Sequence, residues 1–534
     1  MICRTCFSVC LAGLLLGSIL SLAGVAWAVD YYWNVPSGNW ATAGNWNPTG
    51  VPTASDRAYV NNNGTALIDS SGNVCARFFV GQSGNGQLVI HAGELTVSEV
   101  GFVGRYPGYT GTVTLNDGTV TFNGTSLSQL QIGRDQAYGY FYQNGGSVVL
   151  GGAQGALFLG PMGPGRYELQ AGTLTTLQSS IGYGGTYSAQ GGDGFGEFIQ
   201  TGGVHQTEFI CIGEGWDDGG TGVYRLLGGS LTTEELRLGV IDDIRSGNRP
   251  LRGTFYLAGG TLTVGSTIVI GADTYDGGVG GAGVGLFEFT SGVLTDGNQD
   301  ADLIVRYDAP ATGTFQGRGV VDISGTLENN GRVIADGGTL DMSSFASVTS
   351  TVENTTTNGW FARAGGKLLL PAVSVTGAGA YNWGEDPTDS QIDLVNSVRA
   401  GFSDVTGTGE LEIALLDPAH PSAPSVDGIG LVLGLWDIQA SGFQFNRVDL
   451  IFRYDDLLTD DPTRLRLFHW TGTGWEKVPS VLDPANKWIS TSGWQSLGVF
   501  AVSDVPEPAT LGLLLAGLVS FAGWLAWQRR KHQG

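Results

Sequence analysis

The chain of 534 residues is poor in lysine, in histidine and in charged residues altogether. Only 4 residues are Lys, the first of them Lys367, and 26 basic residues stand against 49 acidic ones, for a formal net charge of −23. Because binding to a phosphate backbone needs clustered Lys and Arg, this balance argues against a nucleic-acid-binding protein. The 5 His residues are far apart in the sequence, so they predict no paired-histidine metal site.

Glycine, by contrast, is abundant, with 88 residues, and aromatic residues make up 10% of the chain. Glycine does not recur at every third position and only 18 residues are Pro, which excludes collagen. The 42% of hydrophobic residues can bury a large core, which argues against intrinsic disorder. The glycine excess therefore needs a structural cause within a folded protein.

The first 28 residues have the organisation of a secretory signal peptide. A basic residue, Arg4, precedes an apolar run that ends in the cleavage pattern Ala26-Trp27-Ala28. The alternative is an uncleaved N-terminal anchor. We predict export, with removal of residues 1–28 before folding.

The C-terminal end predicts a transmembrane helix. Residues 509–527 carry no charge, and about 19 residues at ~1.5 Å each nearly span a hydrocarbon core. Arg529, Arg530 and Lys531 follow this stretch. By the positive-inside rule, these residues stay in the cytoplasm and the rest of the chain lies outside.

The motif Val505-Pro506-Glu507-Pro508 stands just before this apolar stretch. The order of Pro-Glu-Pro, apolar helix and terminal basic cluster resembles the PEP-CTERM sorting signal of bacterial exported proteins, over residues 505–531. The resemblance implies processing by an exosortase, a membrane-embedded cysteine protease, and an association with exopolysaccharide or biofilm. An ordinary tail anchor is the alternative.

The middle of the chain is an internal repeat, and such a repeat decides the fold. Eight segments share the pattern G-x6-G, with starts 25 to 32 residues apart. A further Gly follows an alternating apolar segment in most units, as at Gly104 and Gly133, so each unit predicts three short strands separated by glycine turns. The eight segments begin at Gly86, Gly111, Gly139, Gly165, Gly196, Gly222, Gly253 and Gly285.

Three short strands in about 25 residues are typical of one turn of a parallel, right-handed β-helix with glycine at its sharp corners. A β-propeller, the alternative, needs about 40 to 50 residues for each blade. The pattern also resembles the passenger-type repeats of autotransporter-like secreted proteins. That resemblance implies a stalk-like or adhesive body.

The sequence thus predicts an all-β chain, a β-helix solenoid followed by an antiparallel β-sandwich, with a helix at each end. The indoles of Trp33, Trp40 and Trp46 are expected to plug the open N-terminal end of the solenoid. The expected segments are a signal peptide (1–28), a capping module (29–75), Gly-rich β-helix repeats (76–350), a degraded repeat or linker (351–404), a β-sandwich (405–503) and the sorting signal with its transmembrane helix (505–531).

After removal of the signal peptide, only Cys75 and Cys211 remain. Neither has C-x-x-C spacing, which excludes zinc sites and thioredoxin-type sites. The two residues lie in strands five units apart, about 24 Å at ~4.8 Å per turn, whereas a disulfide needs Cα atoms within about 7 Å. We predict two inward-facing thiols outside any disulfide.

One loop in each unit, between the third Gly and the next unit, varies in length and gathers aromatic rings beside carboxylates. Insertions at the same position of successive solenoid repeats lie on one face, which is often the binding face. These rings and carboxylates suit stacking on sugars or a loosely held Ca²⁺, and solvated loops with rings packed on the next turn are the alternative. The candidate residues are Tyr183, Tyr187, Trp216, Asp217, Asp218, Asp242, Asp243, Asp273, Tyr275 and Asp276.

A secreted polysaccharide lyase or hydrolase is the alternative function, because β-helices also carry such enzymes. However, the acidic loop residues recur without a singular motif, the repeats contain no Lys, and no nucleophile elbow, phosphate loop or dinucleotide fingerprint occurs. We predict no catalytic residue and no cofactor or metal. The expected function is that of a structural or adhesive protein of the cell envelope or extracellular matrix, with the exosortase, the membrane and polysaccharide as partners.

Overall fold

The computed structural model describes residues 28–152, 154–184, 194–215, 219–239, 251–271, 283–308, 311–351 and 357–505. The expected signal peptide up to residue 27 and the expected C-terminal helix lie outside these ranges. Across the ranges that are described, no helix is long and apolar enough to cross a membrane. The helical segments found there are the single 3₁₀ turns η2 (Ala43–Asn45), η3 (Asp456–Leu458) and η4 (Pro462–Arg464).

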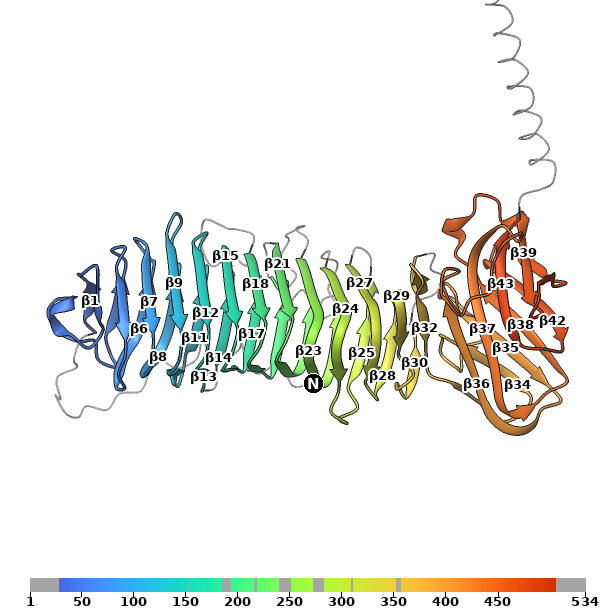
Figure 1. Ribbon diagram of the computed structural model, residues 1–534, viewed down its shortest axis with the longest axis horizontal. Coiled ribbons are helices and arrows are strands. Elements are labelled where there is room, and N and C mark those ends of the chain that lie inside the picture. The colour runs from blue at the N-terminus through green and yellow to red at the C-terminus, as the bar shows by residue number, and fades with distance from the viewer. Residues whose placement is uncertain are drawn as a thin grey trace, which may run out of the picture.

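The prediction of an all-β fold with a solenoid is confirmed: parallel strands stack into a β-solenoid of about 11 turns, which forms an elongated rod (Figure 1). Each strand pairs in parallel with the strand one turn before it and the strand one turn after it, as Thr119, Ser147 and Thr173 do in one column. Three strands make each turn, so the solenoid has three faces. Several long strands bend at a corner and contribute to more than one face.

The first face carries the G-x6-G segments. It contains β2 (Ser37–Asn39), β5 (Thr65–Ile68), β7 (Gly86–Ile90), β9 (Thr110–Leu115), β12 (Tyr138–Gln143), β15 (Pro164–Leu169), β18 (Gly194–Gln200), β21 (Gly220–Leu226), the first parts of β23 (Leu251–Ile270), β24 (Gly283–Thr295), β27 (Ala311–Asp322) and β29 (Arg332–Asp341), and β31 (Gly359–Arg363).

The second face follows it along the chain. It contains the first parts of β6 (Asn73–Val80), β8 (Glu94–Val103) and β22 (Ser230–Leu238), the strands β10 (Thr119–Phe122), β13 (Ser147–Leu150), β16 (Thr173–Thr175) and β19 (Val204–Gln206), the later parts of β23, β24, β27 and β29, and finally β32 (Lys367–Leu369).

The third face closes each turn. It contains β1 (Asp30–Trp33), β4 (Arg57–Val60), the second parts of β6, β8 and β22, the end of β23, and the strands β11 (Ser128–Ile132), β14 (Gly155–Leu159), β17 (Gln178–Ile181), β20 (Phe209–Ile212), β25 (Asp302–Val305), β28 (Thr326–Asn329) and β30 (Ser347–Thr349). Two short strands, β3 (Trp46–Asn47) and β26 (Tyr307–Asp308), pair in antiparallel fashion with β1 and β27.

Side chains alternate along each strand between the core and the surface, and on the first face the core is a ladder of aromatic rings. Neighbouring rings lie parallel, with centroids 4.5 to 5.1 Å apart, close to the spacing of successive strands. Stacking therefore follows from placing an aromatic residue at one position of seven consecutive turns. The rings belong to Phe141, Tyr167, Phe198, Tyr224, Phe255, Phe287 and Phe315, all fully or almost fully buried.

Glycine forms the corner between the third face and the first, as predicted. Gly104 ends a third-face segment with φ of 70°, a left-handed conformation that residues with a Cβ resist. Gly111 begins a G-x6-G segment, and a Cβ there would lie 2.0 Å from the carbonyl oxygen of Val80 in the turn before. Glycine is thus needed twice at this corner, once for backbone conformation and once for close approach of neighbouring turns.

One of the two cysteines has the predicted inward orientation, and the other does not. Cys75 is buried in the core, whereas Cys211 lies on the outer side of β20 between the inward-facing Ile210 and Ile212. The prediction of an inward Cys211 is wrong because side chains alternate along β20 and Ile210 and Ile212 occupy the inward positions. Cys75 is also not its equivalent by register, since it lies in the second-face part of β6. Both residues are in the described part of the chain, and no disulfide joins them.

Three indoles lie at the N-terminal end of the solenoid. Trp33, Trp40 and Trp46 are buried, and the ring of Trp46 meets those of Trp33 and Trp40 edge-on at 4.9 and 4.8 Å. The Nε1 of Trp46 donates a hydrogen bond to the Trp40 carbonyl at 2.8 Å. The apolar end of the first turn is therefore covered by side chains of its own chain.

Two antiparallel sheets follow the solenoid and form what we call the two-sheet module. Rings from the two sheets pack against each other, with Trp436 and Phe452 4.9 Å apart and Phe402 and Phe443 5.2 Å apart. One sheet contains β33 (Val373–Val375), β36 (Thr406–Leu416), β37 (Leu431–Gln444), β43 (Gly498–Asp504), β39 (Leu465–Trp470) and β40 (Trp475–Lys477). The other contains β34 (Gly379–Trp383), β35 (Val398–Ser403), β38 (Arg447–Arg453), β42 (Trp488–Trp494) and β41 (Val481–Asp483).

The module begins earlier than the sequence suggests. Strands β34 and β35 fall within residues 351–404, the expected linker, yet they form one side of the second sheet. The first sheet is continuous with the solenoid, because β32 of the last turn pairs with β36 of the module. The rod and the module are thus joined by backbone hydrogen bonds rather than by a flexible connection.

Side chains reinforce this junction. Trp360 in the last turn donates from Nε1 to the Gly384 carbonyl at 2.8 Å and accepts at its own carbonyl from Asn396 Nδ2 at 2.7 Å. The Nε1 of Trp436 in the module donates to the Asn396 carbonyl at 2.9 Å. Residues 384–397 therefore seal the C-terminal end of the solenoid.

Candidate functional site

The variable loops enter and leave the solenoid at one corner, between the third face and the first. The last core residues before four of these loops, Ile181, Ile212, Leu238 and Ile270, stand in one register column on successive turns. Gly196, Gly222, Gly253 and Gly285 form the matching column after the loops. We call this edge the loop corner.

Only one of the predicted ligand-binding loop residues lies in the described part of the chain. Tyr183 is 9% exposed, and its ring meets that of Phe158 edge-on at 5.8 Å. This ring packs against a strand of the solenoid and does not project from it. The other candidates, Tyr187, Trp216, Asp217, Asp218, Asp242, Asp243, Asp273, Tyr275 and Asp276, lie outside the described residues.

Earlier turns of the loop corner expose rings that the sequence had not singled out. Tyr106, Tyr109 and Tyr138 are 39%, 37% and 49% exposed, and Phe195 is 44% exposed two turns after Tyr138. The guanidinium of Arg105 lies 5.2 Å from the ring centroid of Tyr106. Their common position just before a G-x6-G segment is the signal that could have identified them.

A second column of rings runs along the outside of the third face near the N-terminus. Tyr32, Tyr59, Phe79 and Phe102 stack with centroids 4.6 to 5.0 Å apart, and Arg105 covers the last two rings at 5.2 and 4.6 Å. Tyr59, Phe79 and Phe102 are buried and Tyr32 is 46% exposed. The accessible part of this column is therefore its N-terminal end.

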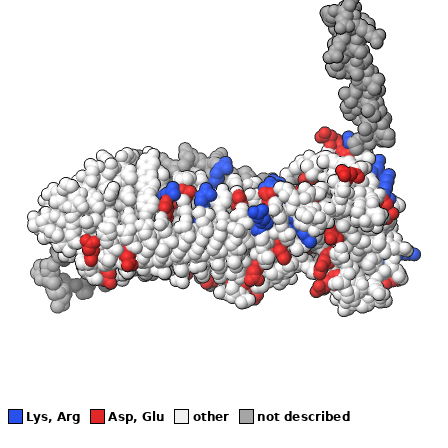
Figure 2. All heavy atoms as spheres, in the orientation of Figure 1, with Lys and Arg blue, Asp and Glu red and all other residues white. Residues whose placement is uncertain are grey.

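Charged side chains are sparse over the rod, and near its N-terminal end the face that Figure 2 shows carries a few acidic side chains and no basic ones. On the first face, Arg166 and Arg225 both pair with Glu197 of the turn between them, whose carboxylate lies 3.6 Å from Arg166 and 3.3 Å from Arg225. Such pairs neutralise the basic groups. The surface of the described rod is therefore acidic or neutral rather than basic.

Burial moves the pKa of His205 and that of Glu385 far from their usual values. His205 stacks on Phe198 at 5.1 Å, and burial lowers its pKa from 6.5 to about 3. Because Tyr224 donates its hydroxyl proton to Gln200, the Nδ1 of His205, 3.1 Å from that oxygen, is the donor between them. The neutral imidazole is a structural group of the core.

Glu385 is the second such group, at the junction with the two-sheet module. Burial raises its pKa from 4.5 to about 7, against the lowering effect of bonds from the Leu394 and Asp393 N–H groups at 2.5 and 3.0 Å and from the Ser397 hydroxyl. The charge of Asp393 also raises it. Considering the described residues alone, no group of three or more His, Cys, Asp or Glu side chains could hold a metal ion.

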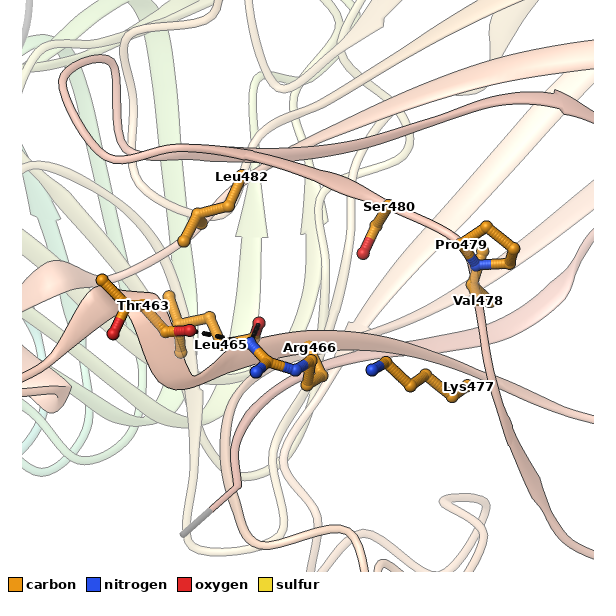
Figure 3. Close-up of a pocket in the computed structure, with 8 residues that line it drawn as sticks. All are labelled: Thr463, Leu465, Arg466, Lys477, Val478, Pro479, Ser480 and Leu482. Atoms are coloured by element: carbon orange, nitrogen blue, oxygen red, sulfur yellow. Dashed lines mark hydrogen bonds between the residues drawn. The ribbon is translucent and has the colours of Figure 1, made fainter. Parts of the chain in front are cut away.

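A groove of about 620 Å³ lies at the edge of the two-sheet module, between β39 and β40 of one sheet and β41 of the other (Figure 3). Its basic residues are Arg466, whose guanidinium turns back toward Thr463 and Leu465, and Lys477, whose ammonium end points toward Arg466 (Figure 3). Apolar side chains and two hydroxyls complete the lining, from Thr463, Leu465, Val478, Pro479, Ser480 and Leu482. The sequence had given no indication of this groove.

Comparison with protein families identifies the C-terminal segment. Residues 504–531 match the PEP-CTERM protein-sorting motif. The PEP-CTERM motif indicates an exported protein that an exosortase processes, and this part of the sequence prediction is confirmed. Of the predicted motif residues, Val505 is described, and Pro506, Glu507, Pro508, Arg529, Arg530 and Lys531 lie outside the described residues.

The motif begins where the folded module ends. Strand β43 finishes at Asp504, and the N–H of Val505 donates to the Arg464 carbonyl at 3.3 Å. The PEP-CTERM segment therefore follows the last strand without a spacer. Neither the comparison with curated proteins nor the comparison with solved structures finds a match.

Proposed function

We propose that the protein is a structural or adhesive component of the cell envelope or extracellular matrix, released or anchored at the surface after exosortase processing. The PEP-CTERM motif placed directly after the last folded strand is the observation that carries this proposal. A transmembrane helix over residues 509–527 would hold the protein in the membrane until processing, with its basic end in the cytoplasm.

The rod supports a structural role over a catalytic one. It has about 11 turns, its strands pair continuously into the module, and His205 in its core is neutral. The exposed rings of Tyr106, Tyr109 and Tyr138 on the loop corner suit stacking on sugars. The proposed ligand of this corner is polysaccharide of the matrix.

Mass spectrometry of the protein from its native envelope tests the processing. We expect a mature C-terminus between Pro506 and Thr510. A chain that keeps Arg529, Arg530 and Lys531 would instead be an ordinary tail-anchored protein, and the proposal of exosortase release would be withdrawn.

Binding of the purified chain to a glycan array tests the ligand. Tyr138→Ala is expected to weaken polysaccharide binding severalfold, because it removes a ring that is 49% exposed on the loop corner. Phe209→Ala is the matched control, since Phe209 is 41% exposed at a different corner, where β20 begins. Turnover of a uronic-acid polymer without stable binding would favour a polysaccharide lyase or hydrolase.

A further inference from the structure

We propose that the groove at the edge of the two-sheet module, between β39, β40 and β41, binds a sugar unit that carries a carboxylate. The inference rests on the proposed function in taking the ligand to be a saccharide of the matrix, and it adds the chemical class of that saccharide. Its volume of about 620 Å³ lies within the ~300–1,000 Å³ of small-molecule sites.

The groove holds two cations that have no ion pair among the described residues, although the chain has a net charge of −23. Their neighbours are paired: Arg464 lies 2.7 Å from Asp504, and Lys487 lies 2.9 Å from Asp456. Arg466 and Lys477 have no such partner in the described structure. Two such cations in one groove of an otherwise acidic protein form a local site that attracts anions.

The nearest carboxylates along the chain are engaged elsewhere. Asp461 accepts hydrogen bonds from the N–H and the hydroxyl of Thr463, at 3.1 and 2.6 Å. Glu476 stands beside Lys477 in β40 but points to the opposite side of the strand, 3.3 Å from His469. Of the eight described residues that line the groove, none is acidic.

The guanidinium of Arg466 is held in place by its own backbone. Its Nη1 donates to the carbonyl oxygens of Thr463 and Leu465, both at 2.7 Å. A guanidinium has five N–H donors, so these two bonds leave the Nε–Nη2 edge for a bidentate carboxylate. Lys477 supplies a second positive charge toward the same space (Figure 3).

The remaining lining fits a sugar ring rather than a bare ion. Pro479 and Leu482 give the groove an accessible apolar side, against which the C–H face of a ring can pack, whereas Leu465 and Val478 are buried. The hydroxyl of Ser480 lies across from the two cations (Figure 3) and can bond a sugar hydroxyl. The apolar side, the hydroxyl and the two cations would contact the ring face, a hydroxyl and the carboxylate of a uronic-acid unit.

Calorimetry of the full chain in detergent with tri-galacturonate tests the inference. We expect saturable binding that weakens as salt is added, and no binding of the fully methyl-esterified trisaccharide, which has the same ring but no charge. Arg466→Gln should weaken binding at least tenfold, and Lys477→Gln severalfold. Lys487→Gln, which removes a cation outside the groove, should leave it unchanged.

Several outcomes would overturn the inference. Equal binding by wild type and both groove variants would place the anion site elsewhere, and equal binding of the methyl ester would remove the role of charge. Competition by poly-glutamate with the same affinity would make the groove a site for acidic peptides. If Arg466→Gln fails to fold, Lys477→Gln still tests the groove. This variant should fold, because the side chain of Lys477 makes no hydrogen bond in the described structure.

The experiments distinguish a failure of this inference from a failure of the proposed function. Arg466-dependent binding of tri-galacturonate by a chain that is never processed, and whose Tyr138→Ala variant binds polysaccharide normally, would overturn the proposed function alone. A processed chain with Tyr138-dependent binding but no Arg466 dependence would overturn the groove alone.

Discussion

The solenoid and the two-sheet module build their hydrophobic cores from β-strands in different ways. In the solenoid each strand pairs with the same position one turn away, so the core is a column of repeated side chains such as the ring ladder. In the module, antiparallel strands bring together residues far apart in sequence, as when Trp436 pairs with Phe500. The repeated core builds length, and the irregular one builds a singular groove.

The largest effect should come from breaking the ring ladder. Phe255 is fully buried between Tyr224 and Phe287, with both centroids at 5.1 Å, so Phe255→Ala should lower the free energy of unfolding by about 3–5 kcal/mol. Urea denaturation measures the loss. Hydrogen exchange should show it concentrated in the adjacent turns, because each turn contacts only its neighbours.

Thr254→Ala is the control, since Thr254 is the outward neighbour of Phe255 in β23 and should cost less than about 1 kcal/mol. Equal losses in the two variants would contradict the ladder as the source of stability. Loss of protection in the two-sheet module as large as in the adjacent turns would contradict the local character of the solenoid core.

The sequence predicts the repeated solenoid better than it predicts the irregular two-sheet module. Glycines such as Gly104 and Gly111 repeat at fixed positions, so their corners, the three faces and the absence of a Cys75–Cys211 disulfide could be predicted. The outward orientation of Cys211 follows from the alternation Phe209-Ile210-Cys211-Ile212, in which both Ile residues face the core, so the sequence contained this signal. The bend of β6, which puts Cys75 on another face, leaves no mark in a pattern of alternation.

The candidate sites were less predictable for a related reason. The loop corner could be inferred from the phase of the insertions, but exposure of Tyr106 and Tyr138 depends on how short loops fold back on the turn. Arg466 and Lys477 come together only through the antiparallel pairing of β39 with β40. Nothing repeats there, so no pattern indicates the groove before the strands are paired.

The second prediction concerns the corners of the solenoid. Gly111→Ala should destabilise the chain by about 1–3 kcal/mol, because the new Cβ would lie 2.0 Å from the Val80 carbonyl and push two turns apart. Thermal denaturation measures the change. Gly44→Ala, at an N-terminal position with no atom within 4 Å of the Cβ, should have almost no effect, and a similar loss in both variants would mean that crowding at the corner is not its cause.

A third prediction uses His205 as a probe of the solenoid core. Its pKa is about 3 in the folded chain and near 6.5 when unfolded, so acid protonates the unfolded chain first. Stability should therefore fall as pH drops from 6.5 toward 3, by up to about 1.4 kcal/mol for each pH unit from this residue. His205→Leu, flanked in its column by Leu174 and Leu231, should flatten that part of the pH profile.

Urea titrations at several pH values, compared between wild type and variant, isolate the contribution of His205. His91→Leu is the matched control, because His91 is exposed on another turn and should leave the pH profile as it is. Parallel profiles for wild type and His205→Leu would mean that the imidazole is not buried in the neutral form.

The last prediction concerns the junction and has the opposite sign. The pKa of Glu385 is about 7 when folded and near 4.5 when unfolded, so the folded chain holds the proton more tightly. This contribution is complete below pH 4.5 and is lost as pH rises through 7, by up to about 1.4 kcal/mol for each unit. Glu385→Gln keeps an oxygen that can accept the hydrogen bonds of the Asp393 and Leu394 N–H groups, but it cannot ionise, so it should remove this slope. The control, Glu410→Gln at an exposed position, should keep the slope.

If wild type instead gains stability from pH 4.5 to 7 relative to Glu385→Gln, the carboxyl is ionised at the junction. The seal between rod and module would then depend on a charge rather than on burial.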